Sequence, residues 1–583
     1  MGGHLLKIAH IEVRNFRGIQ KMDWSPEPGI NCLIGPGDST KTTVLDAIEL
    51  ALNPRSLFVG EDTDFYNLNC TVPITIIITL TGLPTEFYSD ERYGLHLRGW
   101  DASKKVLNDE PKTGCEDALS IRVTIDPESL EGRWSIFNDR LIGEADPPSL
   151  RYKDSRRLST TRLGPYAERH LGWSRNSILS KIGEQGNMNA QLAVATRAAR
   201  DAFSKSDKTP FADVTARAEE LGKLFSVPVK DKYAAELDIQ GALITSGGVA
   251  LHDGKLALRT LGTGSSRLIV SALQHSAGGS QVALVDELEH GLEPHRIARL
   301  LKYLISPPTQ EGELAATSPQ VFMTSHSPVV IRELRANNIF AVRSIGGVTS
   351  VQSIEESATD VGTAQRHLRS TPEAFLARRV LIGEGKTEYG LLRGLDSCWS
   401  TSKFNSFAYQ GVVATDGGGI PKALALAKHL LMLGFDVGCV LDSDQPPSGA
   451  DIDEIQKLGG KVFIWPDSCS TEQRMFCDLP WATVQKLVAY AVECDGEDRI
   501  LHTINTAMKN GQQNLTSTVI TLQQESDALR TILGDAAKTD RKCWFHDIER
   551  AEHVANLVFH SLAEVNKKPF ASILADVRKW IDD

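Results

Sequence analysis

Four carboxylates in the second half of the chain share one setting, the end of a short apolar run. They are Glu384, Glu388, Asp442 and Asp444. Hard divalent cations take oxygen ligands, and Mg²⁺ binds through a few carboxylates while it keeps several waters. Two such ions a few ångströms apart can hold both the attacking and the leaving oxygen of a phosphodiester. The pattern therefore predicts a two-ion site for Mg²⁺ or Mn²⁺ that acts on phosphate groups.

The segments around these acids predict a β-α-β-α-β series. In order they are a strand at 380–382, a helix from 385, a strand at 411–414, a glycine-rich turn at 415–419, a helix at 421–433 and a strand at 437–441. If the first helical turn begins at Gly385, Glu384 and Glu388 can face the same side. We expect the glycine-rich turn to let the backbone approach closely.

The first half of the chain contains a second phosphate-binding pattern. An apolar strand at 30–34 runs into a glycine-rich loop, Lys-Thr and a helix, which is the setting of a Walker A motif. The loop N–H groups and the helix N-terminus would face the phosphates of ATP. Lys41 would reach the β- and γ-phosphates, and Thr42 would hold Mg²⁺. The residues expected to bind the nucleotide here are Gly35, Gly37, Lys41, Thr42 and Thr43.

This loop departs from the motif at one position. Thr40 stands where a glycine normally precedes the lysine. A side chain at that place crowds the phosphate cradle, so we expect weak nucleotide affinity or weak hydrolysis.

Three further segments complete the predicted ATP site. An apolar strand ends in Asp286-Glu287, where Asp286 would bind Mg²⁺ through water and Glu287 would polarise the attacking water. His326 follows the next strand. A lone histidine is usually structural, but at this place it can sense the γ-phosphate. The glycine-rich segment 261–267, with Gly264, opens a helix just before the Asp286-Glu287 strand.

A helical insertion is expected at 151–235. Two alanine-rich stretches, 185–203 and 214–225, have helical spacing and offer a dimerisation or clamp element. The segment 151–162 holds five basic residues and one acid. It suits contacts to phosphates, but a solvated charged edge is an equally good interpretation. One of its arginines is also a candidate to approach the nucleotide.

Taken in this order, the first half resembles the ABC ATPase heads of the SMC, RecF and Rad50 kind. That resemblance implies that segment 261–267, with Gly264, closes over the ATP of another protomer, which needs at least a homodimer. The second half resembles a TOPRIM domain, in which a glutamate, a glycine and D-x-D follow successive strands. An ABC head joined to a TOPRIM domain resembles the OLD (overcoming lysogenization defect) family. The resemblance implies an α/β chain with an ABC head at 1–150 and 236–370, the insertion between them, and a TOPRIM domain at 371–583 with a helical insertion at about 482–560.

The OLD resemblance also implies an activity. It suggests an ATP-regulated, metal-dependent DNA endonuclease or nickase in bacterial defence against phage, working as a homodimer or larger homo-oligomer, alone or with a partner protein or nucleic-acid component. It further implies another acid after D-x-D and a lysine near the C-terminus. Glu472 and Lys567 are the best candidates. No chemistry is expected from 482–560.

Composition limits the other classes of protein. The 583 residues are 41% hydrophobic and 23% charged, which suits several globular domains. A net charge of −11 argues against a general DNA-coating protein. The nine cysteines form no C-x-x-C pair. With no signal peptide and no apolar run of ~20 residues, we expect a cytoplasmic chain without membrane contact.

Two alternatives remain at this stage. A TOPRIM topoisomerase or primase would need a nucleophilic tyrosine in a DNA-gate domain or a zinc ribbon, and neither is found. A non-catalytic RecF-like DNA clamp has no need for four carboxylates at strand ends.

Overall fold

The computed structural model divides the chain into two compact units. The first contains Met1–Asn31 and Thr42–Ser325, and the second contains Cys32–Lys41 and His326–Asp583. The structure describes residues 6–583 except 54–58, 142–147, 159, 165–166, 174–176, 180–187, 226, 228–231, 238–247, 277–281, 306–318, 356–361, 403, 509–514, 519–521, 523 and 539–542. In the described part, no helix is both long enough and apolar enough to cross a membrane.

Much of the first unit is an antiparallel sheet in the order β6-β5-β7-β4-β1-β2, with β8 paired to β7. Alternating side chains explain it, because Ile11 and Val13 of β1 are fully buried while Glu12 and Arg14 are only partly buried. The strands are β1 (Lys7–Phe16), β2 (Ile19–Trp24), β4 (Ile74–Thr81), β5 (Arg98–Asp101), β6 (Val106–Asn108), β7 (Glu116–Ile125) and β8 (Gly132–Phe137).

The first unit also contains three parallel strands in the order β13-β12-β9, which are Gln320–Thr324, Val282–Val285 and Thr161–Leu163. Both β12 and β13 are buried along their whole length, as expected for parallel strands covered on both faces. The buried Gln320 side chain joins β13 to β1, because its amide accepts from Ile8 N at 2.8 Å and donates to Ile8 O at 3.1 Å.

The helices of the first unit include the two predicted in the insertion. α4 and α5 confirm the alanine-rich helical stretches, although residues 185–187 lie outside the described part. The helices are α1 (Lys41–Leu52), α2 (Tyr152–Leu158), α4 (Met188–Ser204), α5 (Ala212–Leu224), α6 (Thr263–Ser276) and α7 (Pro294–Ile305). A small hairpin joins β10 (His252–Asp253) and β11 (Leu256–Ala257).

In the second unit, a strand leads into the glycine-rich loop of the Walker A motif, called the P-loop below. A β-hairpin from much later in the sequence pairs with this strand and supports it. β3 (Ile30–Ile34) pairs in parallel with β14 (Ile339–Ile345), and β14 pairs antiparallel with β15 (Val348–Ser353). Two short helices follow in this part, α8 (Pro328–Glu333) and α9 (Thr363–Ser370).

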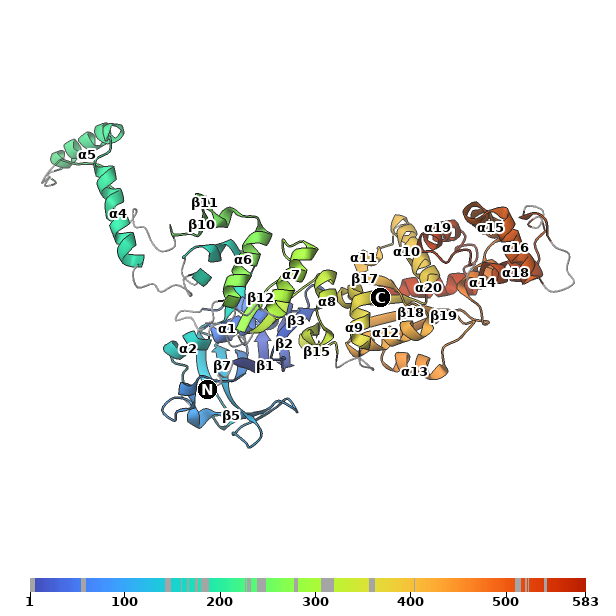
Figure 1. The fold of residues 1–583 in the computed structure, drawn as a ribbon, viewed down its shortest axis with the longest axis horizontal. Helices are drawn as coiled ribbons and strands as arrows, with labels where there is room; N and C mark the ends of the chain where they lie inside the picture. The colour runs from blue at the N-terminus through green and yellow to red at the C-terminus, as the bar shows by residue number, and fades with distance from the viewer. Residues whose placement is uncertain are drawn as a thin grey trace, which may run out of the picture. The chain divides into compact units, whose positions relative to one another are not determined.

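A four-stranded parallel sheet forms the centre of the rest of the second unit, in the order β17-β16-β18-β19 (Figure 1). The predicted strands and helices of the β-α-β-α-β series are confirmed. The strands are β16 (Arg379–Gly383), β17 (Val412–Asp416), β18 (Asp436–Leu441) and β19 (Lys461–Ile464). The connecting helices are α10 (Lys386–Thr401), α11 (Phe407–Gln410), α12 (Ile420–Met432) and α13 (Gly449–Lys457).

The β14–β15 hairpin is bonded directly to this parallel sheet and its helices. Arg343 of β14 donates to the carbonyls of Ala377 and Arg378, just before β16. His429 of α12 lies with Nε2 2.9 Å from the Ile354 carbonyl and Nδ1 3.0 Å from His367 Nδ1. A carbonyl only accepts, so His429 carries its hydrogen on Nε2 and accepts from His367. Burial lowers the pKa of both rings, that of His367 to about 4, which keeps the pair neutral near pH 7.

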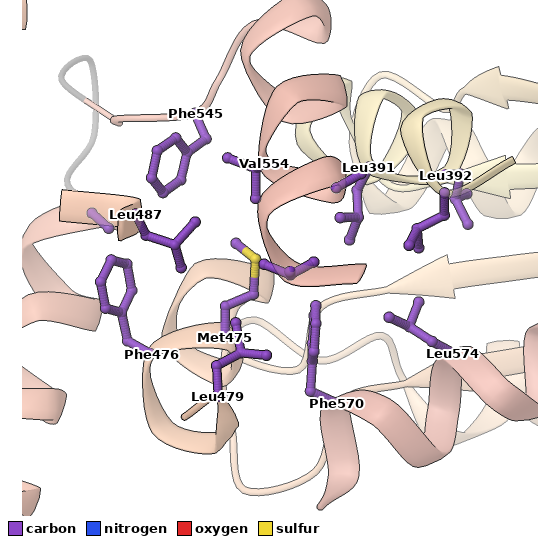
Figure 2. Packing of buried hydrophobic residues seen from close by; sticks show 14 of the residues in the cluster. Leu391, Leu392, Met475, Phe476, Leu479, Leu487, Phe545, Val554, Phe570 and Leu574 are labelled. Carbon is purple, nitrogen blue, oxygen red and sulfur yellow. The ribbon is translucent and has the colours of Figure 1, made fainter. Parts of the chain in front are cut away.

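The C-terminal helices share one hydrophobic core with the parallel sheet. Figure 2 shows apolar side chains of α10, α14, α19 and α20 meeting around Met475 and Phe570. The segment 482–560, interpreted from sequence as an insertion, supplies Leu487, Phe545 and Val554 to that core. The helices are α14 (Thr471–Asp478), α15 (Trp481–Asp495), α16 (Glu497–Ala507), α18 (Asp527–Lys538), α19 (Ile548–Phe559) and α20 (Pro569–Asp582).

Two glycines let α10 and α19 pack at very short range. A Cβ on Gly390 would lie 2.5 Å from Ile548 O, and one on Gly394 would lie 2.5 Å from Ala555 Cβ and 2.6 Å from Glu552 O. Contacts this short are not tolerated, so the two helices must separate if either glycine gains a side chain.

We therefore predict that Gly394→Ala destabilises the protein by about 1–3 kcal/mol, the usual cost of forcing extra atoms into a packed core. The gain in helix propensity of about 1 kcal/mol only partly offsets it. Gly449→Ala is the matched control, because a Cβ there would meet no atom within 4 Å. Urea unfolding measures both variants. Equal midpoints for Gly394→Ala and the unmodified chain would contradict the packing described here.

Candidate metal and nucleotide sites

The predicted acids come together at the carboxyl end of the parallel sheet. Glu384 follows β16 and Asp442 follows β18, and these strands are parallel neighbours with Gly383 opposite Val440. Glu384 N donates to the Val440 carbonyl at 2.9 Å, and Asp442 N donates to Glu384 Oε2 at 2.8 Å. The backbone of each strand end thereby fixes the other.

Glu388 and Glu472 approach the same place from the first turns of two helices. Glu388 lies in α10, where its Oε2 accepts from Gly385 N at 2.9 Å and the side chain is buried. Glu472 lies in α14, is also buried, and accepts from Ser470 Oγ at 3.0 Å and from Cys543 Sγ at 3.3 Å. Carboxylates are favoured at helix N-termini by the helix dipole.

Asp442 is oriented by Thr471, a residue that the sequence analysis missed. Asp442 Oδ1 accepts from Thr471 N at 3.0 Å and from Thr471 Oγ1 at 2.8 Å. These two bonds hold one carboxylate oxygen and leave Oδ2 available to other partners.

Glycines allow the acids to approach one another. A Cβ on Gly383 would lie 2.8 Å from Tyr389 N, and one on Gly417 would lie 2.5 Å from Ala423 Cβ. The turn after β17 is bonded to the end of β16, because Gly417 N donates to Gly383 O and Gly419 N to Glu384 O, both at 2.8 Å. The close backbone approach predicted for this turn is confirmed.

Asp444 is paired with a lysine that the sequence did not indicate. Lys538 Nζ, at the end of α18, lies 2.7 Å from Asp444 Oδ2. Lys567, the predicted lysine, lies on the exposed turn before α20, and among the described contacts none joins it to these acids. Lys538 and Cys543 both come from 482–560, so this region does supply side chains to the site.

The charge of the cluster is not balanced by the chain itself. Burial raises the pKa of Glu384, Glu388 and Asp442, and the neighbouring carboxylates raise it further. The pKa of Glu388 reaches about 7. Five carboxylates face one lysine among the described contacts. An all-oxygen set with excess negative charge fits a hard divalent cation.

The ligand atoms of the acids around Asp442 are nevertheless not closely spaced. In the described part of the chain, only His10, Glu12 and Asp23 bring three such ligand atoms within 4.8 Å of one another. That trio already holds the Arg14 guanidinium, 2.6 Å from Asp23 and 3.3 Å from Glu12, so it is no metal site. The acids around Asp442 are spaced more widely, which suits Mg²⁺ because this ion keeps part of its water shell.

The P-loop leads from β3 into α1. The side chain of its lysine, Lys41, is hydrogen-bonded to atoms of the loop itself. Lys41 Nζ donates to Pro36 O at 2.7 Å, Ser39 Oγ at 3.0 Å and Gly35 O at 3.2 Å. A Cβ on Gly35 would lie 2.5 Å from the Val342 carbonyl of β14. A Cβ on Gly37 would meet no atom within 4 Å, so this position faces open space.

Thr40, the residue that departs from the motif, adopts a left-handed backbone with φ +67°. This conformation strains a β-branched residue. Its hydroxyl donates to Ser39 O at 2.6 Å and lies 3.1 Å from the hydroxyl of Thr349 on β15. The hairpin thus contributes to holding Thr40 in a conformation that glycine would adopt freely.

In the first unit, Asp286 and Thr42, both proposed from sequence as Mg²⁺ ligands, lie together. Thr42 Oγ1 is 3.3 Å from Asp286 Oδ1, and Thr324 Oγ1 donates to the same oxygen at 2.7 Å. Glu287 follows with an exposed side chain and φ +48°, and its N–H donates to Thr324 Oγ1 at 2.8 Å. Thr43 is half-buried in α1.

The remaining predicted nucleotide residues have mixed positions. His326 is exposed and is the second residue after the end of β13. Gly264 is pressed against the chain itself, since a Cβ there would lie 2.1 Å from Gly291 O, so its lack of a side chain already has a packing reason. Arg267, buried completely, donates to the carbonyls of Asp286 and Glu287 at 2.8 Å and was missed from the sequence.

Three arginines of the basic segment 151–162 are paired within the chain. Arg157 lies 2.7 Å from Glu86, and Arg151 donates to the Glu91 carbonyl at 3.1 Å. Arg162 is enclosed by Asp46, Glu49 and Asp286. These contacts favour the charged-edge interpretation over a surface reserved for phosphates, and they place Arg162 beside Asp286.

Comparison with known proteins identifies the ATPase part. Residues 30–332, just over half of the chain, match the family described as "AAA domain, putative AbiEii toxin, Type IV TA system". The chain belongs to this family and carries an ATPase domain of its kind. The predicted α/β fold class is confirmed.

Other similarities are partial. A stretch of 57 residues is 39% identical to the DNA replication and repair protein RecF of Roseiflexus castenholzii and spans 14% of that protein. The chain is also similar to the Smc head domain bound to the C-terminal domain of ScpA from Pyrococcus furiosus, with 12% identity, a TM-score of 0.35, and 60% of this chain and 98% of that chain covered. The recombination mediator protein RecF with ATPrS gives 11% identity, a TM-score of 0.32 and coverage of 60% and 99%.

The excess charge in the acid cluster generates a stability prediction. Asp442→Asn should raise the free energy of unfolding in EDTA by about 1–2 kcal/mol, because it removes one of several repelling charges while the amide oxygen still accepts both Thr471 bonds. Added Mn²⁺ should stabilise the unmodified chain and have much less effect on the variant. Thermal unfolding with EDTA and with Mn²⁺ measures this.

Asp453→Asn is the charge-matched control, because Asp453 is exposed on α13. This variant should leave unchanged both the free energy of unfolding in EDTA and the stabilisation by Mn²⁺. A lower melting temperature for Asp442→Asn in EDTA, or equal Mn²⁺ stabilisation of both variants, would contradict an uncompensated metal-binding cluster.

Proposed function

We propose that this chain is an ATP-regulated DNA endonuclease or nickase that depends on Mg²⁺ or Mn²⁺. The observation that carries the proposal is the group of carboxylates at the carboxyl end of the parallel sheet, in which Glu388 and Glu472 are buried and Glu384, Asp442 and Asp444 are half-buried. A protein that only binds DNA gains nothing from burying acids whose charges repel one another.

The side chains have distinct tasks in this proposal. Bound Mg²⁺ or Mn²⁺ supplies a polarised phosphate and an activated water. Thr471 fixes the orientation of Asp442, and the Asp442 N–H fixes Glu384. Lys538, anchored at Asp444, offers a positive charge to the phosphate in the transition state.

The order of the acids supports a TOPRIM domain and, with the ATPase domain before it, membership of the OLD family. Glutamate after β16, glycines after β17 and D-x-D after β18 follow the expected series. The family description, which refers to a type IV toxin–antitoxin system, supports a role in bacterial defence against phage. A partner protein or nucleic-acid component of such a system belongs to the same proposal.

ATP is proposed to regulate cleavage rather than to drive it. Lys41, Thr42, Asp286 and Glu287 supply the expected groups, whereas Thr40 stands in place of a glycine in a left-handed backbone conformation. The β14–β15 hairpin contacts the P-loop through Thr349 and the region before β16 through Arg343. A change at the loop can therefore reach the acid cluster through bonded elements.

Plasmid cleavage by the purified full-length chain tests the proposal. Asp442→Asn and Glu388→Gln should lower the cleavage rate with Mg²⁺ or Mn²⁺ by roughly a hundredfold or more, because each removes a metal ligand. Lys538→Gln should lower it roughly tenfold or more, and by more than Lys567→Gln does. The assay is run with and without ATP.

Lys457→Gln, an exposed change at the end of α13, is the control for loss of a positive charge. Undiminished cutting by Asp442→Asn and Glu388→Gln would reject the nuclease site. A larger loss for Lys567→Gln than for Lys538→Gln would reassign the lysine. Relaxed topoisomers without nicks would favour the topoisomerase alternative, and DNA binding without any cleavage would favour the RecF-like clamp.

We also propose that the chain forms at least a homodimer. α4, α5 and the segment after them leave large apolar side chains open to solvent, including Val214 at 73%, Leu224 at 73% and Phe225 at 75% exposure. Apolar surface of this kind marks an interaction site, and a two-fold pairing of identical chains is the commonest closed symmetry.

Light scattering on the full-length chain measures the assembly. The expected mass is at least twice 63.8 kDa. Val214→Glu with Leu224→Glu should lower the mass, because buried charges oppose the contact, while Glu219→Gln on the same helix should not. A mass of 63.8 kDa at micromolar concentration with and without ATP would reject the dimer.

A further inference from the structure

Arg162 on β9 is held by three carboxylates of the first unit. Its guanidinium lies 2.9 Å from Asp286 Oδ2 and 2.9 Å from Glu49 Oε2, and it also pairs with Asp46. The side chain is only 19% exposed. A forked guanidinium can serve several oxygens at once, which a lysine cannot do as well.

The backbone on both sides of Arg162 is fixed. Thr160 exchanges two hydrogen bonds with Asn53 after α1, from Thr160 N to Asn53 Oδ1 at 3.1 Å and from Asn53 Nδ2 to Thr160 Oγ1 at 2.8 Å. On the other side, Asp286 N donates to the Leu163 carbonyl at 2.9 Å. A change of partner at Arg162 therefore needs only a movement of its side chain.

Both oxygens of Asp286 are engaged. Oδ1 accepts from Thr324 and Thr42, and Oδ2 faces Arg162. In P-loop ATPases, Mg²⁺ is held by the P-loop hydroxyl and the Walker B aspartate. Arg162 therefore places its positive charge on the carboxylate that the metal ion requires.

We propose that Arg162 is an internal cation that competes with Mg²⁺ for Asp286 and so sets the Mg²⁺ concentration at which nucleotide binds. The inference rests on the proposed ATP site. Two cations beside one carboxylate repel each other. When the metal nucleotide binds, the guanidinium leaves Asp286 and stays with Glu49 and with Asp46, which it shares with Arg17. Arg162 is thus a positioning residue for the metal rather than a catalytic one.

The test is a Mg²⁺ titration of the full-length chain at a fixed concentration of a fluorescent ATP analogue. Arg162→Gln should lower the Mg²⁺ midpoint of nucleotide binding about five- to tenfold, since it removes the competitor. The double variant Arg162→Gln with Glu49→Gln restores the local net charge. If Arg162 competes at Asp286, the Mg²⁺ midpoint of the double variant stays low. A midpoint equal to that of the unmodified chain would overturn the inference, because the effect would then come from the local net charge alone.

Arg162→Lys keeps the charge without the fork and should give an intermediate midpoint, and it decides the question if Arg162→Gln fails to fold. An unchanged midpoint in a folded Arg162→Gln overturns the inference. So does a higher midpoint with selective loss of ATP over ADP, which would make Arg162 a phosphate ligand. If the unmodified chain binds no nucleotide at any Mg²⁺ concentration, the proposed ATP site itself is rejected. That result differs from equal midpoints with intact binding, which reject only the role of Arg162.

Discussion

Repulsion among carboxylates at the end of the parallel sheet is the constraint on which the second unit depends. Glu384 and Asp442 are brought there by strand pairing, and Glu388 and Glu472 by helix starts. Each approach needs local support, which Gly383, Gly417 and Thr471 provide. The large apolar core of C-terminal helices supplies the stability that such a group of charges removes.

The positions of the acids at strand ends could be predicted from sequence because they are local properties. An apolar run followed by Glu or D-x-D places the side chain at a strand end, and neighbouring parallel strands bring their ends together. Lys538 and Cys543 gave no such signal. They reach the acids only because α18 and the segment after it fold back onto α14, which is a matter of tertiary packing. The lysine expected from family resemblance, Lys567, is exposed instead.

Prediction from sequence has similar limits in the ATPase part. The composition of the strands and loops predicts the P-loop and Asp286-Glu287, but it does not predict which residues Arg162 and Arg267 contact. A basic segment looks the same in sequence whether it faces solvent or encloses a salt bridge. Gly264 illustrates the converse, since a glycine that fits a nucleotide-binding motif also has a steric reason within its own chain.

The pairing of β3 with β14 has a consequence for the newborn protein. Leu33 lies opposite Phe340, so β3, which leads into the P-loop, cannot pair with β14 until about 300 further residues have been synthesised. At a synthesis rate of roughly 5–20 residues per second, this delay is roughly 15–60 seconds. A ribosome-bound chain thus lacks a supported P-loop until β14 and β15 emerge, and the acids of the parallel sheet emerge later still. The order of translation keeps the acid cluster from forming before the ATPase part that is proposed to regulate it.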